Sequence, residues 1–278
     1  MKQDKNDDFK CSIVEFDNML EQKEYIKEAV KNKKLRIFTE IEPGDFFGNS
    51  TIEQSMDAME YGLETQTRSF LDKLSDVSSD EGFNEGFYMD YTGFAYDMGS
   101  VVAGEPECCL NMSDLNVTKS INILVDIGFN GETTATQITN RSIAIVNLIE
   151  TLMLKKYIVN LKFINYNIQK DMSTLVITNT DTKDVNIANI AMLSSPQFFR
   201  QITWTTRDVI RGKNSKFGRG YTESNRFFKE EIKKQDAFFI PGSFMDKRHY
   251  EDSTYCNVEN ANKYITQLFN NYCETKGE

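Results

Sequence analysis

Hydrophobic residues follow two different periods in the middle of the chain. Residues 121–127 (INILVDI) form a short run rich in Val and Ile that ends at Gly128, which is typical of a strand buried on both faces. Apolar residues then recur at steps of three and four over residues 138–153, and this spacing predicts an amphipathic helix. Residues 157–163 (YIVNLKF) alternate and predict a second strand. Together they predict a βαβ unit with parallel strands.

The same patterns predict further elements on the C-terminal side. Strands are expected at residues 173–179 and 237–240, and helices at residues 185–192, 196–210 and 258–272. The resulting order, β-α-β-β-α-β-α, is typical of an open α/β sheet. We therefore predict an α/β fold with an open, mostly parallel, Rossmann-like sheet in residues 101–278.

A mainly helical region packed on this core is predicted for residues 1–100. One helix is expected at residues 12–31, followed by a short strand at residues 36–41. A longer helix is expected to begin at a capping box made by Ser50 and Glu53 and to end near Asp76. Residues 78–90 (SSDEGFNEGFYMD) predict an acidic loop, and residues 91–99 a further strand.

The charge of the chain is distributed unevenly. The net charge of the 278 residues is -10, but residues 51–120 hold fourteen acidic residues against three basic ones. Residues 121–278 hold seventeen acidic and twenty basic residues. This asymmetry argues against a protein that coats nucleic acid with its whole surface, and it leaves a local basic site open.

Cysteine and histidine usage excludes several kinds of site. The five cysteines form no CxxC pair, and the single histidine, His249, makes a histidine-rich metal site or a Ser/His pair improbable. An odd number of cysteines without a signal peptide indicates a reducing compartment. No stretch approaches the roughly 20 apolar residues that a membrane helix needs. We expect a soluble, intracellular protein without a membrane partner.

The end of the first predicted strand is the first candidate site, because open parallel sheets bind ligands at the carboxyl ends of their strands. Asp126, Asn130 and Thr133 would place oxygen ligands there for a hard cation such as Mg²⁺. The run Asp126-Ile127-Gly128-Phe129-Asn130 resembles the Asp-x-Ser-x-Ser metal loop of von Willebrand factor A domains, although only the aspartate matches. The alternative is that Asp126 caps the loop and that the sheet has lost its ion. Neither GxGxxG nor a P-loop is present, so no nucleotide cofactor is predicted.

A basic stretch is the second candidate site. Residues 207–234 hold nine basic residues against four acidic ones, interleaved with aromatic residues. Basic groups follow phosphates and aromatic rings stack on unpaired bases, so the stretch suits single-stranded nucleic acid. An ordinary surface loop beside a helix has the same composition, and both interpretations stay open. The candidate contacts are Arg207, Arg211, Lys213, Lys216, Arg219, Tyr221 and Arg226.

Four segments, which fall in order within residues 45–270, resemble an uncharacterised family of tailed-bacteriophage proteins. They are FFGNSTIEQSMDAMEYG (46–62), AGEPECCLNM (103–112), INILVDIGFNGETTATQITNRSIAIVNLIETL (121–152) and AFFIPG (237–242). Asn49 stands where the family usually has Gly. The resemblance implies a viral origin, a location in the host cytoplasm, and a von Willebrand A-like sheet with a degraded metal site. It supplies no catalytic residues.

Three functions follow from these observations. The leading hypothesis is a non-enzymatic phage accessory protein that binds a protein partner through its sheet end and acidic surface. The partner would be the transcription machinery of phage or host, or a virion protein. This hypothesis rests on an α/β fold that shows neither a cofactor fingerprint nor a catalytic constellation. The second is a single-stranded nucleic acid or transcription accessory factor that uses the basic stretch. The third is a magnesium-dependent enzyme or adhesion-like module centred on Asp126.

Overall fold

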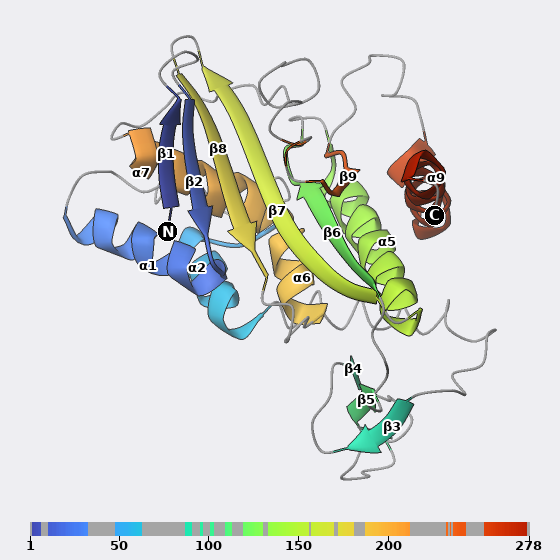
Figure 1. Cartoon of the computed structure of the whole chain (residues 1–278). Helices are drawn as coiled ribbons and strands as arrows, with labels where there is room; N and C mark the ends of the chain where they lie inside the picture. The colour runs from blue at the N-terminus through green and yellow to red at the C-terminus, as the bar shows by residue number, and fades with distance from the viewer. Residues whose placement is uncertain are drawn as a thin grey trace.

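The computed structural model describes most of the core of the chain (Figure 1). The described residues are 2–6, 11–32, 48–62, 87–90, 95–96, 101–102, 109–112, 119–129, 133–155, 157–169, 172–180, 187–211, 232, 234, 236–242 and 253–276.

A six-stranded mixed sheet forms the centre of the fold, with the strand order β1-β2-β8-β7-β6-β9. The strands are β1 (Lys2–Asn6), β2 (Cys11–Phe16), β6 (Lys119–Asp126), β7 (Tyr157–Gln169), β8 (Met172–Asn179) and β9 (Phe238–Ile240). The pairs β2/β8, β6/β7 and β6/β9 are parallel, whereas β1/β2 and β7/β8 are antiparallel. The predicted α/β class with a mostly parallel sheet is therefore confirmed.

The predicted βαβ unit is present as β6, helix α5 (Ala135–Leu154) and β7. Helix α5 begins with a capping box, in which the Thr134 side chain accepts from the Gln137 backbone and the Gln137 side chain accepts from the Thr134 backbone. Ile138, Ile145 and Ile149 on the predicted apolar stripe are buried. One detail was wrong: β6 is not buried on both faces along its whole length, because Asn122 is exposed.

The described helices that pack on the sheet cover one of its two faces. They share a hydrophobic core with the odd-numbered residues of β6 and β7, including Ile123, Val125 and Phe163. Even-numbered residues such as Leu124 and Ile164 point to the other face and join a separate small cluster with Ile232. The packed helices are α1 (Met19–Lys31), α2 (Ile52–Tyr61), α5, α6 (Ile187–Leu193), the π-helical turn η3 (Phe198–Thr203), α7 (Trp204–Arg211) and α9 (Val258–Lys276).

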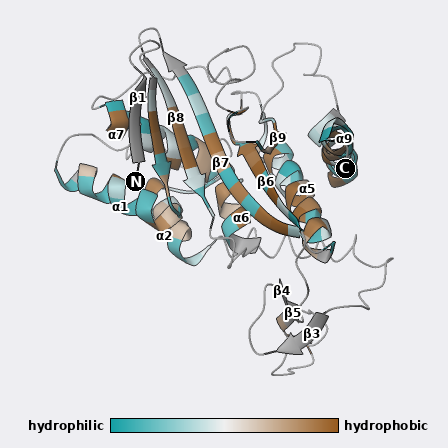
Figure 2. Cartoon of the chain, in the orientation of Figure 1, coloured by the Kyte–Doolittle hydropathy of each residue, from teal (hydrophilic) through white to brown (hydrophobic). Residues whose placement is uncertain are grey.

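The alternation of apolar and polar residues along β7 reflects these two faces, and Figure 2 shows brown and teal alternating along this strand. Part of the second face is covered as well, because Leu124, Ile164 and Ile177 are buried and the helical residue Ile232 packs against their cluster. We call the face that lies opposite the helices the open face. Among the described helices, none is long and apolar enough to cross a lipid bilayer.

Several predictions for the N-terminal region were wrong. Residues 12–16 belong to strand β2, which pairs in parallel with β8, so only the later part of the predicted helix at residues 12–31 is helical. The capping box lies one residue further along than predicted, at Thr51 and Gln54. Helix α2 ends at Tyr61 because Gly62 adopts a φ of 79°, a conformation that favours glycine and ends helices.

A small antiparallel sheet follows in the described part of residues 87–112. It consists of β3 (Phe87–Asp90), β5 (Cys109–Met112) and β4 (Ala95–Tyr96), with β5 in the middle. The end of the predicted acidic loop is thus a strand. Among the described residues of the N-terminal region, strands β1 and β2 of the main sheet therefore accompany the helices α1 and α2. The strand predicted at residues 36–41 and the helix predicted after Gly62 lie outside the described residues.

One carboxyl group in the fold should make stability depend on pH. Burial on α5 raises the pKa of Glu150 from its usual 4.5 to about 7. Between these two pH values the folded protein keeps a proton that the unfolded chain releases, so stability is highest below about pH 4.5 and falls as the pH rises through 7. We expect the free energy of unfolding to fall by about 2 kcal/mol less between pH 5 and pH 8 in Glu150→Gln than in the wild type, as measured by urea unfolding. The exposed Glu259→Gln serves as control, and equal pH slopes in Glu150→Gln and the wild type would contradict the prediction.

Candidate functional site

Asp126, the centre of the predicted magnesium site, is the last residue of β6. The Asp126 side chain is fully buried, and its Oδ1 accepts from the backbone N–H of Gly128 at 2.8 Å. This contact is what the capping interpretation of Asp126 predicts. The backbone oxygen of Thr133 accepts from Arg200 Nη2 at 2.8 Å, and Asn130 lies outside the described residues.

A buried arginine occupies the space beside the loop after β6. Arg141 of α5 is 0% exposed, and its Nη2 lies 2.9 Å from the backbone oxygen of Asp126, 3.2 Å from that of Ile240 and 2.8 Å from that of Pro241. Its guanidinium carbon lies 5.2 Å from the centroid of the Phe129 ring. The guanidinium of Arg141 places a positive charge beside the end of β6, and this charge opposes the binding of a divalent cation there.

Within the described residues, no group of three or more His, Cys, Asp or Glu side chains could hold a metal ion. Magnesium at Asp126, Asn130 and Thr133 stays a prediction. The arrangement found at Asp126 and Thr133 is one in which arginines bind the backbone of the loop from two sides, Arg141 from α5 and Arg200 from η3.

Two of the predicted nucleic acid contacts face the protein interior. Arg207 is 1% exposed, and its Nε lies 3.4 Å from Asp208 Oδ1. Its guanidinium carbon lies 5.8 Å from the centroid of the Trp204 ring. Arg211 donates from Nε to Thr174 Oγ1 at 3.0 Å and from Nη2 to Asn167 Oδ1 at 3.1 Å. Burial, together with the nearby charge of Arg207, lowers the pKa of Arg211 to about 10.

The role predicted for the basic stretch therefore depends on its other members. Arg211 joins α7 to β7 and β8 through its bonds to Asn167 and Thr174, whereas the contacts of Arg207 with Trp204 and Asp208 lie within α7. Lys213, Lys216, Arg219, Tyr221 and Arg226 lie outside the described residues.

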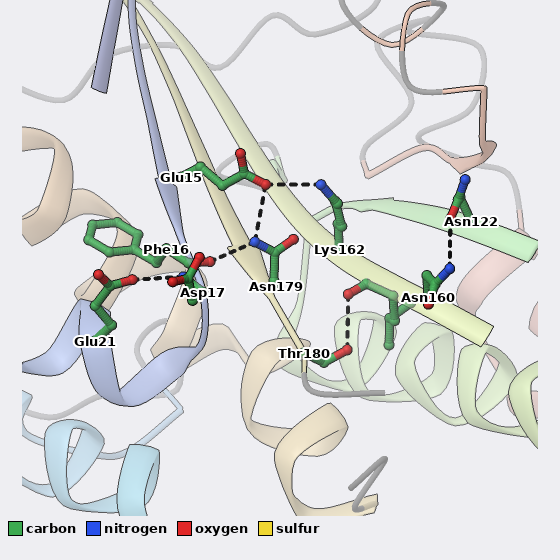
Figure 3. Close-up of polar contacts among 10 residues, drawn as sticks. Glu15, Phe16, Asp17, Glu21, Asn122, Asn160, Lys162, Asn179 and Thr180 are labelled. Carbon is green, nitrogen blue, oxygen red and sulfur yellow. Dashed lines mark hydrogen bonds and ion pairs between the residues drawn. The ribbon is translucent and has the colours of Figure 1, made fainter. Parts of the chain in front are cut away.

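The open face carries a band of polar side chains at the end where β6 and β7 begin, which we call the polar band. It consists of Glu15, Asn122, Asn160, Lys162 and Asn179 (Figure 3). The register places Asn122 opposite Asn160 and Lys162 opposite Asn179, so neighbouring strands bring these side chains together.

Hydrogen bonds link the members of the polar band in two groups. Asn160 Nδ2 donates to Asn122 Oδ1 at 3.0 Å. Glu15 Oε1 accepts from Lys162 Nζ at 2.9 Å and from Asn179 Nδ2 at 3.1 Å, and Asn179 also donates to the backbone oxygen of Phe16 at 2.8 Å. Figure 3 shows Glu15 between Lys162 and Asn179, with the asparagine pair to one side.

The polar band is accessible to a partner. The side chains of Lys162 and Glu15 are 31% and 23% exposed. Ile158, two residues before Asn160 on the same face of β7, is 47% exposed. These side chains are already held by the strands and by one another. Binding a partner would therefore cost little of their conformational entropy. The band offers amide donors, amide acceptors and one ion pair beside an apolar contact.

Sequence reasoning missed the polar band. The signal was the polar residue at every second position in Ile121-Asn122-Ile123 and in Asn160-Leu161-Lys162. Such alternation marks a strand with one solvated face. The band itself depends on register, because it joins residues of four strands that are far apart in the sequence.

The fold and the band define an α/β protein with a mixed sheet, one face of which is partly solvated. The chain belongs to the family described as Domain of unknown function (DUF7192), whose model matches residues 6–271. Searches of curated proteins and of solved structures gave no match.

Proposed function

We propose that this protein is a non-enzymatic accessory protein that binds a protein partner on the polar band of the open face. The observation that carries the proposal is an accessible, rigid patch of hydrogen-bonded side chains next to an exposed isoleucine. A polar surface with an apolar anchor suits a protein interface, in which hydrogen bonds set the orientation and apolar burial adds affinity.

The setting that we propose is the cytoplasm of a bacterial host during phage infection. It rests on the resemblance of four segments of the chain to tailed-bacteriophage proteins, which also suggests a von Willebrand A-like origin for the sheet. The partner that we propose is a component of the transcription machinery of phage or host, or a virion protein.

A capture experiment from infected cells tests the proposal. We expect the tagged protein to retain one specific partner after nuclease treatment, identified by mass spectrometry. Asn160→Arg places a long charged side chain in the middle of the band and should lower capture about tenfold, equivalent to ~1.4 kcal/mol. A photo-crosslinking residue at position 160 should join the partner covalently.

The matched controls use an exposed residue on another element. Gln267 lies on the solvent side of α9, so Gln267→Arg should leave capture unchanged and a crosslinker there should give no product. Recovery that collapses with nuclease would instead favour the single-stranded nucleic acid hypothesis. Equal capture by Asn160→Arg and the wild type would reject the polar band as the interface.

A further inference from the structure

Helices α1 and α2 pack against each other and leave a continuous solvent side. The buried side of α1 includes Met19 and Ile26, and that of α2 includes Ile52 and Met59. The exposed side of the pair, which we call the α1–α2 face, is made by Leu20, Glu24, Glu53, Asp57, Glu60 and Tyr61. This face belongs to the helical layer, so it is distinct from the polar band on the open face (Figure 1).

A lysine joins the two helices. Lys23 is 2% exposed, and its Nζ lies 2.8 Å from Glu60 Oε2 and 3.9 Å from Asp57 Oδ1. Leu20 lies one helical turn before Lys23, and Tyr61 follows Glu60 directly, so this contact brings Leu20 and Tyr61 to the same region of the surface.

These two residues are unusually accessible for large apolar side chains. Leu20 is 50% exposed and Tyr61 is 76% exposed. Glu60 forms hydrogen bonds with both Lys23 and Tyr61, which lower the pKa of its carboxyl and raise the pKa of Tyr61. The Tyr61 hydroxyl therefore lies next to a carboxylate whose pKa is lowered.

Acidic groups surround the two apolar side chains. The face carries four carboxylates, Glu24, Glu53, Asp57 and Glu60, and two lysines lie beside them. Lys23 is engaged by Glu60, and Lys27 binds Glu24 at 2.9 Å. The result is a net negative surface with two apolar contacts on adjacent helices.

We infer that the α1–α2 face docks a basic amphipathic helix of a partner protein. Lysine or arginine side chains of such a helix would meet the exposed carboxylates of Glu53 and Asp57. Lys23 lies 3.9 Å from Asp57, farther than its 2.8 Å from Glu60. The apolar side of the helix would cover Leu20 and Tyr61. This is the helix-on-surface mode of recognition, with charge complementarity setting the direction of approach.

This inference rests on the proposed function in that both assume a protein partner, but it concerns a different surface. A synthetic amphipathic peptide of leucines and lysines serves as the probe, and fluorescence anisotropy measures its binding. We expect Glu53→Lys/Asp57→Lys to weaken binding at least tenfold. Tyr61→Ala changes one exposed side chain and should weaken binding several-fold, while circular dichroism confirms that both variants fold.

A matched double variant separates a specific site from general attraction to an acidic protein. Glu259→Lys/Glu274→Lys changes the net charge by the same amount on the exposed side of α9. Binding that survives this change but not Glu53→Lys/Asp57→Lys supports the inference. Equal weakening by both variants, or equal binding of a leucine-glutamate peptide, would overturn it. So would sedimentation data showing that a second copy of this chain covers the face.

The two proposals can fail separately. If Asn160→Arg abolishes capture and the peptide does not bind, only the α1–α2 face is rejected. If the peptide binds as expected and Asn160→Arg has no effect on capture, the polar band is rejected and the α1–α2 face becomes the interface.

Discussion

Replacing Arg141 with methionine is expected to lower the free energy of unfolding by about 3 kcal/mol or more. The guanidinium binds the backbone oxygens of Asp126, Ile240 and Pro241, which lie at the ends of β6 and β9. Methionine fills most of the volume but leaves these carbonyls without this donor. The effect should be large because β9 pairs with β6 over only three residues.

Urea unfolding followed by circular dichroism measures this change, and two variants control for other causes. Arg141→Lys keeps the charge but not the planar group that reaches several carbonyls, so it should lose nearly as much stability. Lys263→Met removes a charge from the exposed side of α9 and should change stability by less than about 0.5 kcal/mol. A loss in Arg141→Met within the range of Lys263→Met would show that the guanidinium does not hold the two strands together.

The central βαβ unit could be predicted from the sequence because its signals are local. The β6 run, the helical spacing of Ile138, Ile145 and Ile149, and the alternation in β7 each lie within one element. Strand β2 could not be found in the same way. Its six residues run directly into an amphipathic helix, and its strand partner β8 lies about 160 residues further along the chain.

Charged residues on helices usually face solvent, and the fully buried Arg141 is an exception. It flanks the apolar stripe of α5, where side chains point back toward the N-terminal end of the helix. That direction leads to the ends of β6 and β9, whose carbonyl groups need donors. Nothing local in the sequence shows that these carbonyls meet at one point, since the pairing of β6 with β9 joins residues more than 100 positions apart.

The candidate sites show the same difference between local sequence signals and contacts that join distant residues. The sequence placed ligand chemistry at the carboxyl end of β6, which stays a prediction, and it gave no sign that the guanidinium of Arg141 binds the backbone there. The polar band was missed, although each of its asparagines was visible, because only the register of four strands brings them together. The α1–α2 face was missed because α2 was predicted to continue beyond Gly62, which left Tyr61 inside the helix rather than at its exposed end.

The second large effect is expected at Gly242, directly after β9. A Cβ atom at this position would lie 2.3 Å from the backbone oxygen of Gly128 and 2.9 Å from that of Asp126. Both neighbours are backbone atoms of the buried β6–α5 loop, so they cannot move aside as a flexible side chain would. We expect Gly242→Ala to lower the free energy of unfolding by about 3 kcal/mol, measured by urea unfolding.

Gly62→Ala separates this clash from the general cost of replacing glycine. Gly62 has a φ of 79° at the end of α2, so alanine there should cost about 1 kcal/mol through backbone conformation alone. A larger loss at Gly242 than at Gly62 is expected because the clash separates β9 from β6, the same pair of strands that Arg141 joins. Equal losses would mean that the loop can yield, and the close approach of Gly242 to Gly128 would then contribute nothing to holding β9 in the sheet.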